Sequence, residues 1–566
     1  MDFKQKIAEL RAQADEQPVE TIFSGIEIPK AAMGDYAYPC FKLSKALRKA
    51  PPLIASEISS KIEKPDFIEK IEIVGGYLNF FVNKSAIGSA VLDKILSEGE
   101  DYIRSEEGKG KTAVVDYSSP NIAKPFHIGH LRSTVIGNSI CRIYDTLGWK
   151  TVGINHLGDW GTQFGKLISA YTRWGKKEDV EEKGISELNR LYVLFHSEAE
   201  KHPELNDEAR ENLVKMQNGD QEALSLWKWF VDISMREFQR VYDMLDITFD
   251  ACTGESFYND KMPAVVEEIK SKGILKESDG AMIVDLSDYK MPPCLILRRD
   301  GGTLYPTRDI TAALYRKKTY DFSKCIYVTA IDQNLHFAQW FKVLELLGYD
   351  WAKDELVHVP FGLVSLGNAG KLSTRTGNVV LMEDVLKEAI SKTKAIIEEK
   401  NPDLENKDLV ASEVGIGAVI FDNMYNGRIK NIAFDWNKIL NFEGETGPYV
   451  QYTHARACSL LKKAGFEKPI EKVDYSEISD PSSQALIKAL GDLPGKVSEA
   501  AEKYEPYIIS RQLIEICRSF NRFYRDNSVL GSEGAARNAR LSLVWAAKTA
   551  IKSGLYLLGI KAPEQM

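Results

Sequence analysis

The sequence predicts an α/β chain: a parallel β-sheet with crossover helices, preceded by a small α/β domain and followed by an all-α bundle. Three observations favour this architecture. Strand-like and helix-like stretches alternate between about residues 112 and 348, apolar alternation marks a smaller region before them, and the pattern beyond residue 381 is almost wholly helical. With 566 residues, the chain is several times a typical domain, so two to four domains are expected.

The first predicted domain covers residues 1–110. It opens with MDFKQKIAELRAQADE, which reads as an amphipathic helix rather than a signal peptide. Residues 67–83, FIEKIEIVGGYLNFFVN, alternate apolar and polar side chains around two glycines, which predicts a pair of strands. The charged stretch SEGEDYIRSEEGKGK, residues 97–111, is typical of a linker.

The second predicted domain covers residues 111–380. Its first strand, TAVVDYS, runs into a helix in which Leu131, Val135 and Ile140 recur at helical spacing. A polar helical insertion is expected from about 176 to 245. The segment KTVGINHLGDWGTQFG predicts a strand with a Gly-rich turn. AMIVDL with CLILRRDGGTLYPTRD predicts a β-hairpin turning at Asp300-Gly301-Gly302. KCIYVTAIDQNLHFAQWFKVLELLG predicts a strand followed by a helix.

Composition is that of a globular protein. No apolar run reaches the roughly 18 residues needed to cross a bilayer, so no membrane association and a cytoplasmic location are expected. The seven cysteines form no C-x-x-C pair, which indicates mostly buried thiols and no zinc or other protein-bound metal site.

The net charge of −8 is unevenly distributed. Residues 451–566 hold 17 Lys and Arg against 13 Asp and Glu, so this part is positive while the rest is acidic. A basic-leaning helical region suits a polyanionic partner, although a helical surface laced with ion pairs is the alternative interpretation.

A candidate phosphate site lies in HIGH, residues 127–130, where the first strand gives way to a helix. A helix N-terminus offers unpaired N–H groups and partial positive charge. His127 and His130 lie on one side of a turn and can donate N–H groups to phosphate oxygens, while Gly129 lets a flat base approach the backbone. With only two imidazoles, the motif favours electrostatic stabilisation over metal binding.

A second basic, glycine-rich segment is SLGNAGKLSTRTGNVV, residues 365–380. Glycines on both sides of Lys371, Ser373, Thr374 and Arg375 describe a cationic loop of the kind that closes over phosphates. An ordinary surface turn is the alternative.

Together, HIGH and KLSTR resemble the two signatures of class I aminoacyl-tRNA synthetases. SSPNIAKPFHIGHLRSTVIGNSI, HLGDWGTQFG, LYPTRDI, RIKNIAFDW and GPYVQYTHAR resemble the arginyl-tRNA synthetase family along essentially the whole chain. The resemblance implies a Rossmann-type catalytic domain over 111–380, a tRNA-contacting module over 1–110 and a helical anticodon-binding domain over 381–566.

The activity implied by the resemblance is ATP-dependent attachment of L-arginine to tRNA(Arg) through arginyl-adenylate, with release of pyrophosphate and AMP. ATP with Mg²⁺ would be the substrate complex, and a monomer is the family expectation. No covalent enzyme intermediate is needed, so positioning and charge stabilisation carry catalysis. The residues implied to be catalytic are His127, His130, Lys124 and Lys371, and those implied to bind ATP are His127, Gly129, His130, Lys371, Ser373 and Arg375.

Lys124 is included because this chain departs from the general loop signature. Thr374 stands where the second lysine is expected, and Lys124 could supply the missing cation from the opposite side. A solvated loop lysine is the alternative.

Arginine recognition demands carboxylates that face a planar fork of donors. The resemblance implies an arginine site made of Asp116, Asn121, His127, Tyr305, Asp309 and Gln333. A capping role for either Asp is the structural alternative. For tRNA, the implied contacts are Tyr449, Tyr452, Tyr524, Tyr77 and Asn79, although aromatic side chains in helical bundles commonly belong to the core.

Competing functions were a nucleotidyltransferase, which also uses H-x-G-H, and a catalytically silent tRNA-binding relative. A nucleotidyltransferase does not need a long basic-leaning helical bundle. A silent relative would be expected to lack a motif histidine, whereas His127 and His130 are both present. Among synthetases, a cysteine-specific enzyme would want zinc ligands and a glutamate-specific one a basic pocket.

Overall fold

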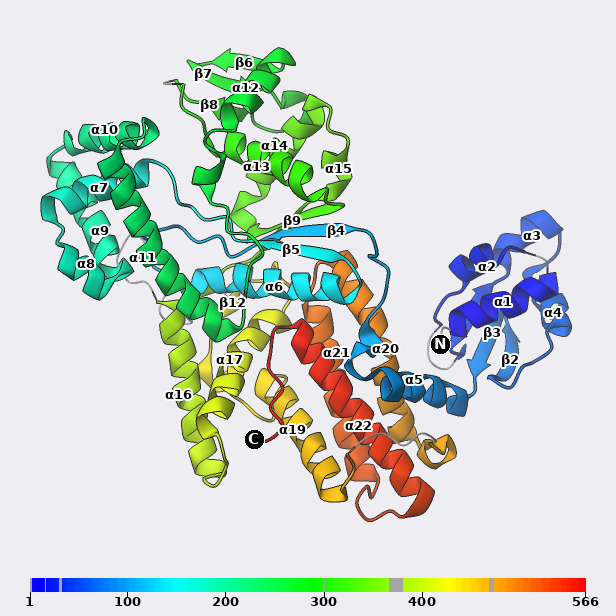
Figure 1. Ribbon diagram of the computed structural model, residues 1–566. Helices are drawn as coiled ribbons and strands as arrows, with labels where there is room; N and C mark the ends of the chain where they lie inside the picture. The colour runs from blue at the N-terminus through cyan, green and yellow to red at the C-terminus, as the bar shows by residue number, and fades with distance from the viewer. Residues whose placement is uncertain (1–2, 16, 30–32, 300, 366–379, 468–472) are drawn as a thin grey trace. The chain divides into compact units, whose positions relative to one another are not determined.

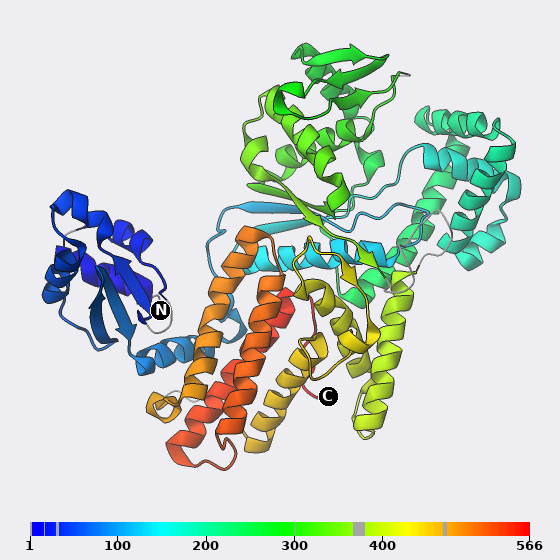
Figure 2. The same cartoon turned by 180° about the vertical axis from the view of Figure 1, so that it is seen from behind.

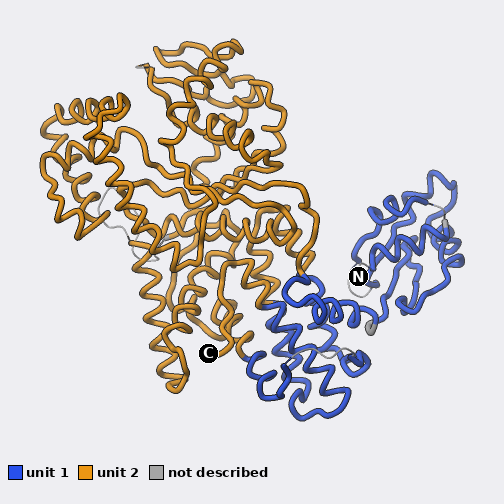
Figure 3. The backbone as a smooth tube through the Cα atoms, viewed as in Figure 1, with its two compact units in different colours: residues 1–102, 456–493, 515–551 blue, residues 103–455, 494–514, 552–566 orange. Residues whose placement is uncertain are grey.

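The computed structural model describes residues 3–15, 17–29, 33–299, 301–365, 380–467 and 473–566. The chain forms two compact units (Figure 3). Unit 1 comprises residues 1–102, 456–493 and 515–551, and unit 2 comprises residues 103–455, 494–514 and 552–566.

The N-terminal part of unit 1 is a three-stranded antiparallel sheet of order β1-β3-β2 with helices packed on it. Its elements are α1 (Phe3–Asp15), α2 (Val19–Gly25), β1 (Tyr36–Pro39), α3 (Phe41–Leu47), α4 (Pro51–Lys61), β2 (Ile68–Val74) and β3 (Tyr77–Val82). The predicted strand pair is confirmed, with Val74 opposite Tyr77. Gly75 and Gly76 form the turn with φ of 58° and 95°, which glycine adopts without a Cβ penalty.

The rest of unit 1 is helical, and several of its helices continue into unit 2. They are α5 (Lys84–Glu98), α19 (Gly447–Ala464), η8 (Tyr475–Ile478), α20 (Pro481–Lys503), α21 (Tyr507–Asp526) and α22 (Gly534–Leu557). The expected linker at 97–111 is wrong in part, because residues 99–103 form the 3-10 helix η2 (Gly99–Ile103). Tyr102 in that helix is buried and its hydroxyl donates to the Leu490 carbonyl at 3.4 Å.

Unit 2 is built on a four-stranded parallel sheet of order β10-β9-β4-β5, which confirms the predicted parallel sheet. The strands are β4 (Thr112–Asp116), β5 (Lys150–Ile154), β9 (Lys324–Ala330) and β10 (Leu356–Phe361). Figures 1 and 2 show α6 on one face and α13, α14 and α15 on the other. These helices are α6 (Leu131–Thr146), α13 (Tyr305–Tyr320), α14 (Asn334–Leu347) and α15 (Trp351–Glu355). Val114, Cys325 and Trp340 belong to the buried cluster between strands and helices.

Two insertions interrupt the alternation of strand and helix, as expected. The helical insertion comprises α7 (Thr162–Trp174), α8 (Lys177–Lys183), α9 (Ile185–Lys201), α10 (Leu205–Gln217) and α11 (Gln221–Leu245). The β insertion is the antiparallel sheet of β6 (Leu275–Ser278), β7 (Ala281–Val284) and β8 (Cys294–Leu297). Around the turn predicted at 300–302 the pairing is a single bridge between Leu297 and Thr303, whereas the tight hairpin joins β6 to β7 and β7 also pairs with β8. Asp300 lies outside the described residues.

Beyond residue 381 the described chain is almost wholly helical, as predicted. Its further elements are α16 (Met382–Lys400), α17 (Lys407–Tyr425), β12 (Ile432–Ala433) and α18 (Trp436–Ile439). The short strand β11 (Val364–Ser365) pairs in parallel with β12. The remaining short elements of unit 2 are η3 (Ile128–His130), η4 (Glu255–Tyr258), α12 (Met262–Ser271), η5 (Ser287–Tyr289) and η6 (Ile331–Gln333). Over the described ranges, none of the helices has the length and apolar character to cross a membrane.

Candidate functional site

The loop between β4 and α6 carries the HIGH motif and has an unusual backbone. Ser118, Ser119 and Ala123 have φ of 69°, 47° and 58°, the left-handed region that L side chains adopt only at a cost. Such strained positions persist where surrounding contacts fix them, and they cluster at functional sites. The loop then enters the single 3-10 turn η3, and α6 follows.

His127 and His130 lie against each other at this turn, with ring centroids 4.1 Å apart. The Gly129 amide donates to His127 Nδ1 at 3.0 Å, and the His127 amide donates to His130 Nδ1 at 3.3 Å. Both Nδ1 atoms are therefore acceptors, so each neutral ring carries its proton on Nε2. Each histidine keeps one N–H group for a partner outside this turn.

Burial keeps both rings neutral near pH 7. It lowers the pKa of His130 to about 3, assisted by the charges of His127 and Lys124. The pKa of His127 is also lowered, mainly by burial and then by Lys124. The pair can therefore stabilise phosphate charge as hydrogen-bond donors rather than as cations.

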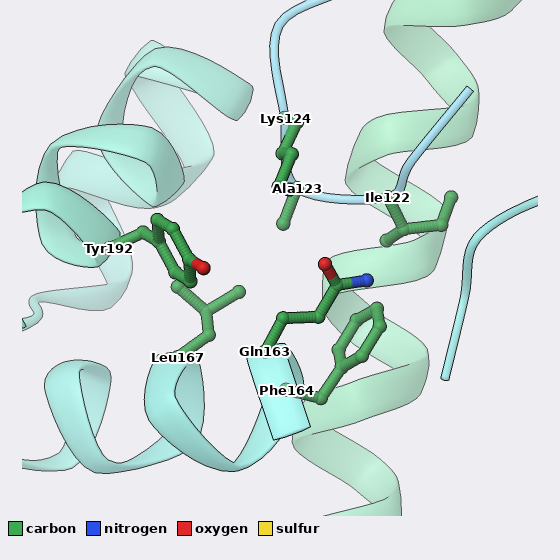
Figure 4. A pocket seen from close by; sticks show the side chains of 7 residues that line it. All are labelled: Ile122, Ala123, Lys124, Gln163, Phe164, Leu167 and Tyr192. Carbon is green, nitrogen blue, oxygen red and sulfur yellow. The ribbon is translucent and has the colours of Figure 1, made fainter. Parts of the chain in front are cut away.

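Lys124 lies beside the same turn and lines a small pocket. Figure 4 shows this pocket between the loop after β4 and the helices α7 and α9. Its lining residues are Ile122, Ala123, Lys124, Gln163, Phe164, Leu167 and Tyr192. The Lys124 ammonium is 5.8 Å from the Tyr192 ring centroid, and burial lowers the pKa of Lys124.

Four residues predicted to form the cationic loop lie outside the described residues: Lys371, Ser373, Thr374 and Arg375. The chain immediately after them is paired with the HIGH segment. The Ile128 amide donates to the Val380 carbonyl at 3.2 Å, the Met382 amide donates to the Phe126 carbonyl at 2.9 Å, and His127 and Leu381 form an antiparallel bridge. Residues 380–382, which follow the second signature in the chain, are therefore joined to the HIGH segment through backbone hydrogen bonds.

The predicted arginine-binding residues come from the carboxyl ends of neighbouring strands, where α/β sheets bind their ligands. Asp116 ends β4, and Gln333 follows β9 in η6 and is exposed. Tyr305 and Asp309 lie one turn apart at the start of α13, where Tyr305 is 65% exposed.

Asp309 and Asp116 have different partners. Asp309 accepts a hydrogen bond from His336 Nε2 at 2.5 Å, and both side chains remain about one quarter exposed. Asp116 forms an ion pair with the buried Arg316, 2.8 Å between Oδ2 and the guanidinium. Sequence reasoning missed both partners, because neither stands next to its acid in the chain.

Asn121 is exposed at the tip of the loop, held against Gly158. The Ile122 amide donates to the Gly158 carbonyl, and the Gly158 amide donates to the Pro120 carbonyl, both at 3.1 Å. A Cβ on Gly158 would meet Asn121 Oδ1 at 2.2 Å, so a larger residue there would displace the Asn121 side chain.

Glu255 is a further acid in this region that the sequence did not reveal, because nothing near it in the chain resembles a site motif. It pairs with Arg308 at 2.8 Å, and both side chains are largely buried. Burial raises the pKa of Glu255 to about 7 despite the opposing charge of Arg308, and the charges of Asp309 and Asp159 add to the rise.

His156 is a half-buried histidine on which the charges of Asp116 and Asp309 both act. Burial lowers its pKa, while the charges of Asp116 and Asp309 both oppose that shift. Its Nδ1 lies 2.9 Å from the Thr253 carbonyl. Over the described parts of the chain, His, Cys, Asp and Glu side chains form no group of three able to hold a metal ion.

The residues predicted to contact tRNA occupy both units. In unit 1, Tyr77 packs edge-on against Phe41 at 5.2 Å, whereas Asn79 is 1% exposed, which favours a structural position for it. Tyr524 is half-buried, with the Arg456 guanidinium 4.4 Å from its ring centroid. In unit 2, Tyr449 is half-buried and Tyr452 is 46% exposed.

Three family models match the chain. Residues 91–436 match "tRNA synthetases class I (R), catalytic domain", residues 450–566 match "DALR anticodon binding domain", and residues 1–82 match "Arginyl tRNA synthetase N terminal domain". The catalytic-domain model alone spans more than half of the chain.

Curated relatives and solved structures agree with these matches. The arginine–tRNA ligase of Clostridioides difficile (strain 630) is 54% identical over 567 residues, and that of Alkaliphilus metalliredigens (strain QYMF) is 52% identical over 568, each match covering 100% of both chains. The solved Thermus thermophilus arginyl-tRNA synthetase superposes with a TM-score of 0.83 at 27% identity, again over 100% of both chains. The chain therefore belongs to the arginyl-tRNA synthetase family of class I tRNA synthetases.

Proposed function

We propose that the strand-end site of unit 2 catalyses ATP-dependent attachment of L-arginine to tRNA(Arg), through arginyl-adenylate, with release of pyrophosphate and AMP. The observation that carries this proposal is the position of two unlike sites on one sheet. Neutral histidine donors lie at a helix N-terminus after β4, and Asp309 of α13 is hydrogen-bonded to His336 of α14, the helix that follows β9. The histidine site suits a nucleoside triphosphate, and the acidic site suits a guanidinium.

In the first step, a carboxylate oxygen of arginine attacks the α-phosphorus of ATP, and the bond to pyrophosphate breaks. His127 and His130 would donate hydrogen bonds from their Nε2–H groups to phosphate oxygens as charge moves toward the leaving pyrophosphate. Because the rings are neutral, they need not lose a proton during the step. Lys124 and Lys371 would add positive charge, and Gly129, Ser373 and Arg375 would contact ATP.

Mg²⁺ would enter with ATP as part of the substrate complex. Carboxylate and phosphate oxygens are its preferred ligands, and it commonly binds through substrate phosphates with few protein ligands.

Arginine would be recognised by Asn121, Tyr305, Asp309 and Gln333, with His127 and Asp116 nearby. A carboxylate can accept two parallel hydrogen bonds from a guanidinium, whereas the lysine ammonium lacks the planar fork of donors and the citrulline side chain lacks the positive charge. Rejection through unpaired buried groups reaches about 10⁴- to 10⁵-fold in sites of this kind, so no editing domain is required.

In the second step, the terminal ribose of tRNA(Arg) takes the arginyl group from the adenylate. We assign residues 1–110 to tRNA contact, 111–380 to catalysis and 381–566 to the anticodon. Tyr77, Tyr449, Tyr452 and Tyr524 are the proposed contacts, and Asn79 would support the strand that carries Tyr77. A cytoplasmic monomer is the proposed working form.

The test is arginine-dependent charging of total tRNA in the presence of ATP and Mg²⁺, with each other amino acid offered as a competitor. Arginine alone should be incorporated, and labelled pyrophosphate should be released. Incorporation of a different amino acid would refute the specificity. Nucleotide transfer without charging of tRNA would favour a nucleotidyltransferase.

A further inference from the structure

Lys124, three residues before His127, carries an ammonium group that no acid of the described residues neutralises. Its side chain is half-buried, and burial is the one cause of its lowered pKa. Its charge reaches both imidazoles of the HIGH turn, since it contributes to the lowered pKa of His127 and of His130. The ammonium is therefore available to meet the negative charge of a ligand bound beside these rings.

The backbone before Lys124 is fixed by contacts with two other segments of unit 2. The Ala123 amide donates to Ser234 Oγ of α11 at 2.9 Å, and Ser234 is fully buried. The Ile122 amide donates to the Gly158 carbonyl at 3.1 Å. These bonds determine where the lysine side chain leaves the loop, but its flexible four-carbon stem leaves the position of the ammonium open.

Tyr192 of α9 meets the ammonium itself. Lys124 Nζ lies 5.8 Å from the centroid of the Tyr192 ring, within the reach of a cation–π contact, and both side chains line the same pocket (Figure 4). The ring is held in turn by His196, one turn later on α9, at 4.7 Å between ring centroids in a T-shaped arrangement. Leu167 of α7 lines the pocket beside it. A fixed aromatic face thus limits the positions that the ammonium can take.

The hydroxyl group of Tyr192 offers a second route to the site. Its pKa is raised, mainly by burial and then by the charge of Tyr305 at the start of α13. Within the described ranges, no hydrogen bond contributes to that shift, which favours the ring as the working part of the side chain. Tyr192→Phe separates the two routes, because it removes the hydroxyl and keeps the ring.

We propose that Tyr192 is a positioning residue for adenylate formation, whose aromatic face holds the Lys124 ammonium beside His127 and His130, where the triphosphate would bind. This inference rests on the role proposed for Lys124 and deepens it. Tyr192 acts through the lysine and touches neither ATP nor arginine. The helical insertion thereby supplies a part of the nucleotide site that the HIGH segment lacks by itself.

The experiment is arginine-dependent exchange of pyrophosphate into ATP in the presence of tRNA(Arg), with kcat and the KM values for ATP and arginine measured separately. Tyr192→Leu should lower kcat about 5- to 30-fold, the range expected for a partly desolvated cation–π contact, and change both KM values less than about twofold. Tyr192→Phe should stay within about twofold of the wild type, since the ring remains. A wild-type kcat for Tyr192→Leu would overturn the inference, and so would a raised KM for arginine in Tyr192→Phe.

A double-mutant cycle with Lys124→Met tests whether the ring acts through the lysine. Lys124→Met alone should lower kcat about 10-fold or more, because a cation at the phosphates is lost. Adding Tyr192→Leu should lower kcat less than about twofold further, because no ammonium remains to be held. Losses that multiply would show that Tyr192 acts by another route and would refute the proposal.

Tyr171→Leu is the matched control for the helical insertion. It removes another half-buried tyrosine ring, which packs 5.3 Å from the Trp229 ring, and it should keep the kcat of the wild type. A loss as large as that of Tyr192→Leu would indicate that loosening of the insertion lowers kcat, and it would contradict the proposal.

Phenylalanine analogues with added ring fluorines at position 192 keep the test decisive if Tyr192→Leu does not fold. Fluorine withdraws electron density from the ring face with little change in shape, so kcat should fall stepwise with each added fluorine. In the Lys124→Met background, the same analogues should have equal kcat values. Equal values in the presence of Lys124 would instead refute the cation–π contact.

Failure of the proposed function has a different signature. A wild-type protein without arginine-dependent exchange would refute that function. A Lys124→Met variant with the kcat of the wild type would refute the role of Lys124 and this inference together. If Lys124→Met is impaired and Tyr192→Leu is not, the inference alone is wrong.

Discussion

His336 Nε2 lies 2.5 Å from Asp309 Oδ2, so a histidine at the start of α14 fixes the orientation of an acid at the start of α13. Gln333 precedes His336 by one turn, and Tyr305 precedes Asp309 by one turn. The contact thus joins two segments that both carry proposed arginine-binding residues. It also leaves the second carboxylate oxygen of Asp309 for a ligand.

Removal of the His336 ring should weaken arginine binding. A hydrogen bond to a charged group contributes about 1.5–3 kcal/mol, so His336→Ala should raise KM for arginine about 10- to 100-fold with a smaller change in kcat. His336→Gln keeps a donor and should recover part of the loss. Steady-state arginylation at varied arginine checks this, and equal KM values for the wild type and His336→Ala would contradict it.

Gly158→Ala should disturb Asn121 directly. The new Cβ would stand 2.2 Å from Asn121 Oδ1, so the side chain must move. KM for arginine should rise roughly 10-fold, which corresponds to about 1.4 kcal/mol. Gly495→Ala is the control, since a Cβ there meets nothing within 4 Å, and its kinetics should match the wild type.

The stability of the protein should depend on pH through His130. Its pKa is about 3 in the folded protein and near 6.5 when unfolded, so between these values the unfolded chain binds the extra proton. The free energy of unfolding should therefore fall as pH falls below about 6.5, by up to about 1.4 kcal/mol per pH unit from this group. Urea denaturation at pH 6.5, 5.5 and 4.5 should show a shallower fall for His130→Gln, and parallel curves would argue against burial of the ring.

Arg132 should contribute more to the free energy of unfolding than an exposed arginine such as Arg173. It is fully buried, and its guanidinium donates to the Gly362 carbonyl at 2.9 Å and to the Lys430 carbonyl at 2.6 Å. Arg132→Met should cost about 1.5–3 kcal/mol in chemical denaturation, because charged hydrogen bonds in the interior are lost. Arg173→Met removes an exposed ion pair with Glu208, which solvent screens, and should change the free energy of unfolding far less.

Periodicity and motif position were enough to predict the elements on which the site is built. β4, η3 and α6 follow from an apolar strand, HIGH and a helical repeat, and the parallel sheet follows from the alternation of strands and helices. These patterns are local. Each one indicates which face of its own helix or strand is buried, so it can be recognised without knowledge of the rest of the fold.

Partners distant in the chain could not be predicted in the same way. Arg316 is 200 residues from Asp116, and Glu255 is 53 residues from Arg308. Each pair forms only when crossover helices return to the sheet, which no spacing in the sequence encodes. The sequence therefore indicated Asp116 as a candidate site residue, but it did not indicate that Arg316 is its ion-pair partner.

The backbone pairing of residues 380–382 with Phe126 and Ile128 limits how this enzyme can be re-engineered. A cationic loop transplanted from another synthetase would be attached, at its downstream end, to the peptide groups on either side of His127. A chimaera that changes the length of this junction would also displace the His127 imidazole. Donor loops should therefore be exchanged together with the residues from Phe126 to Ile128.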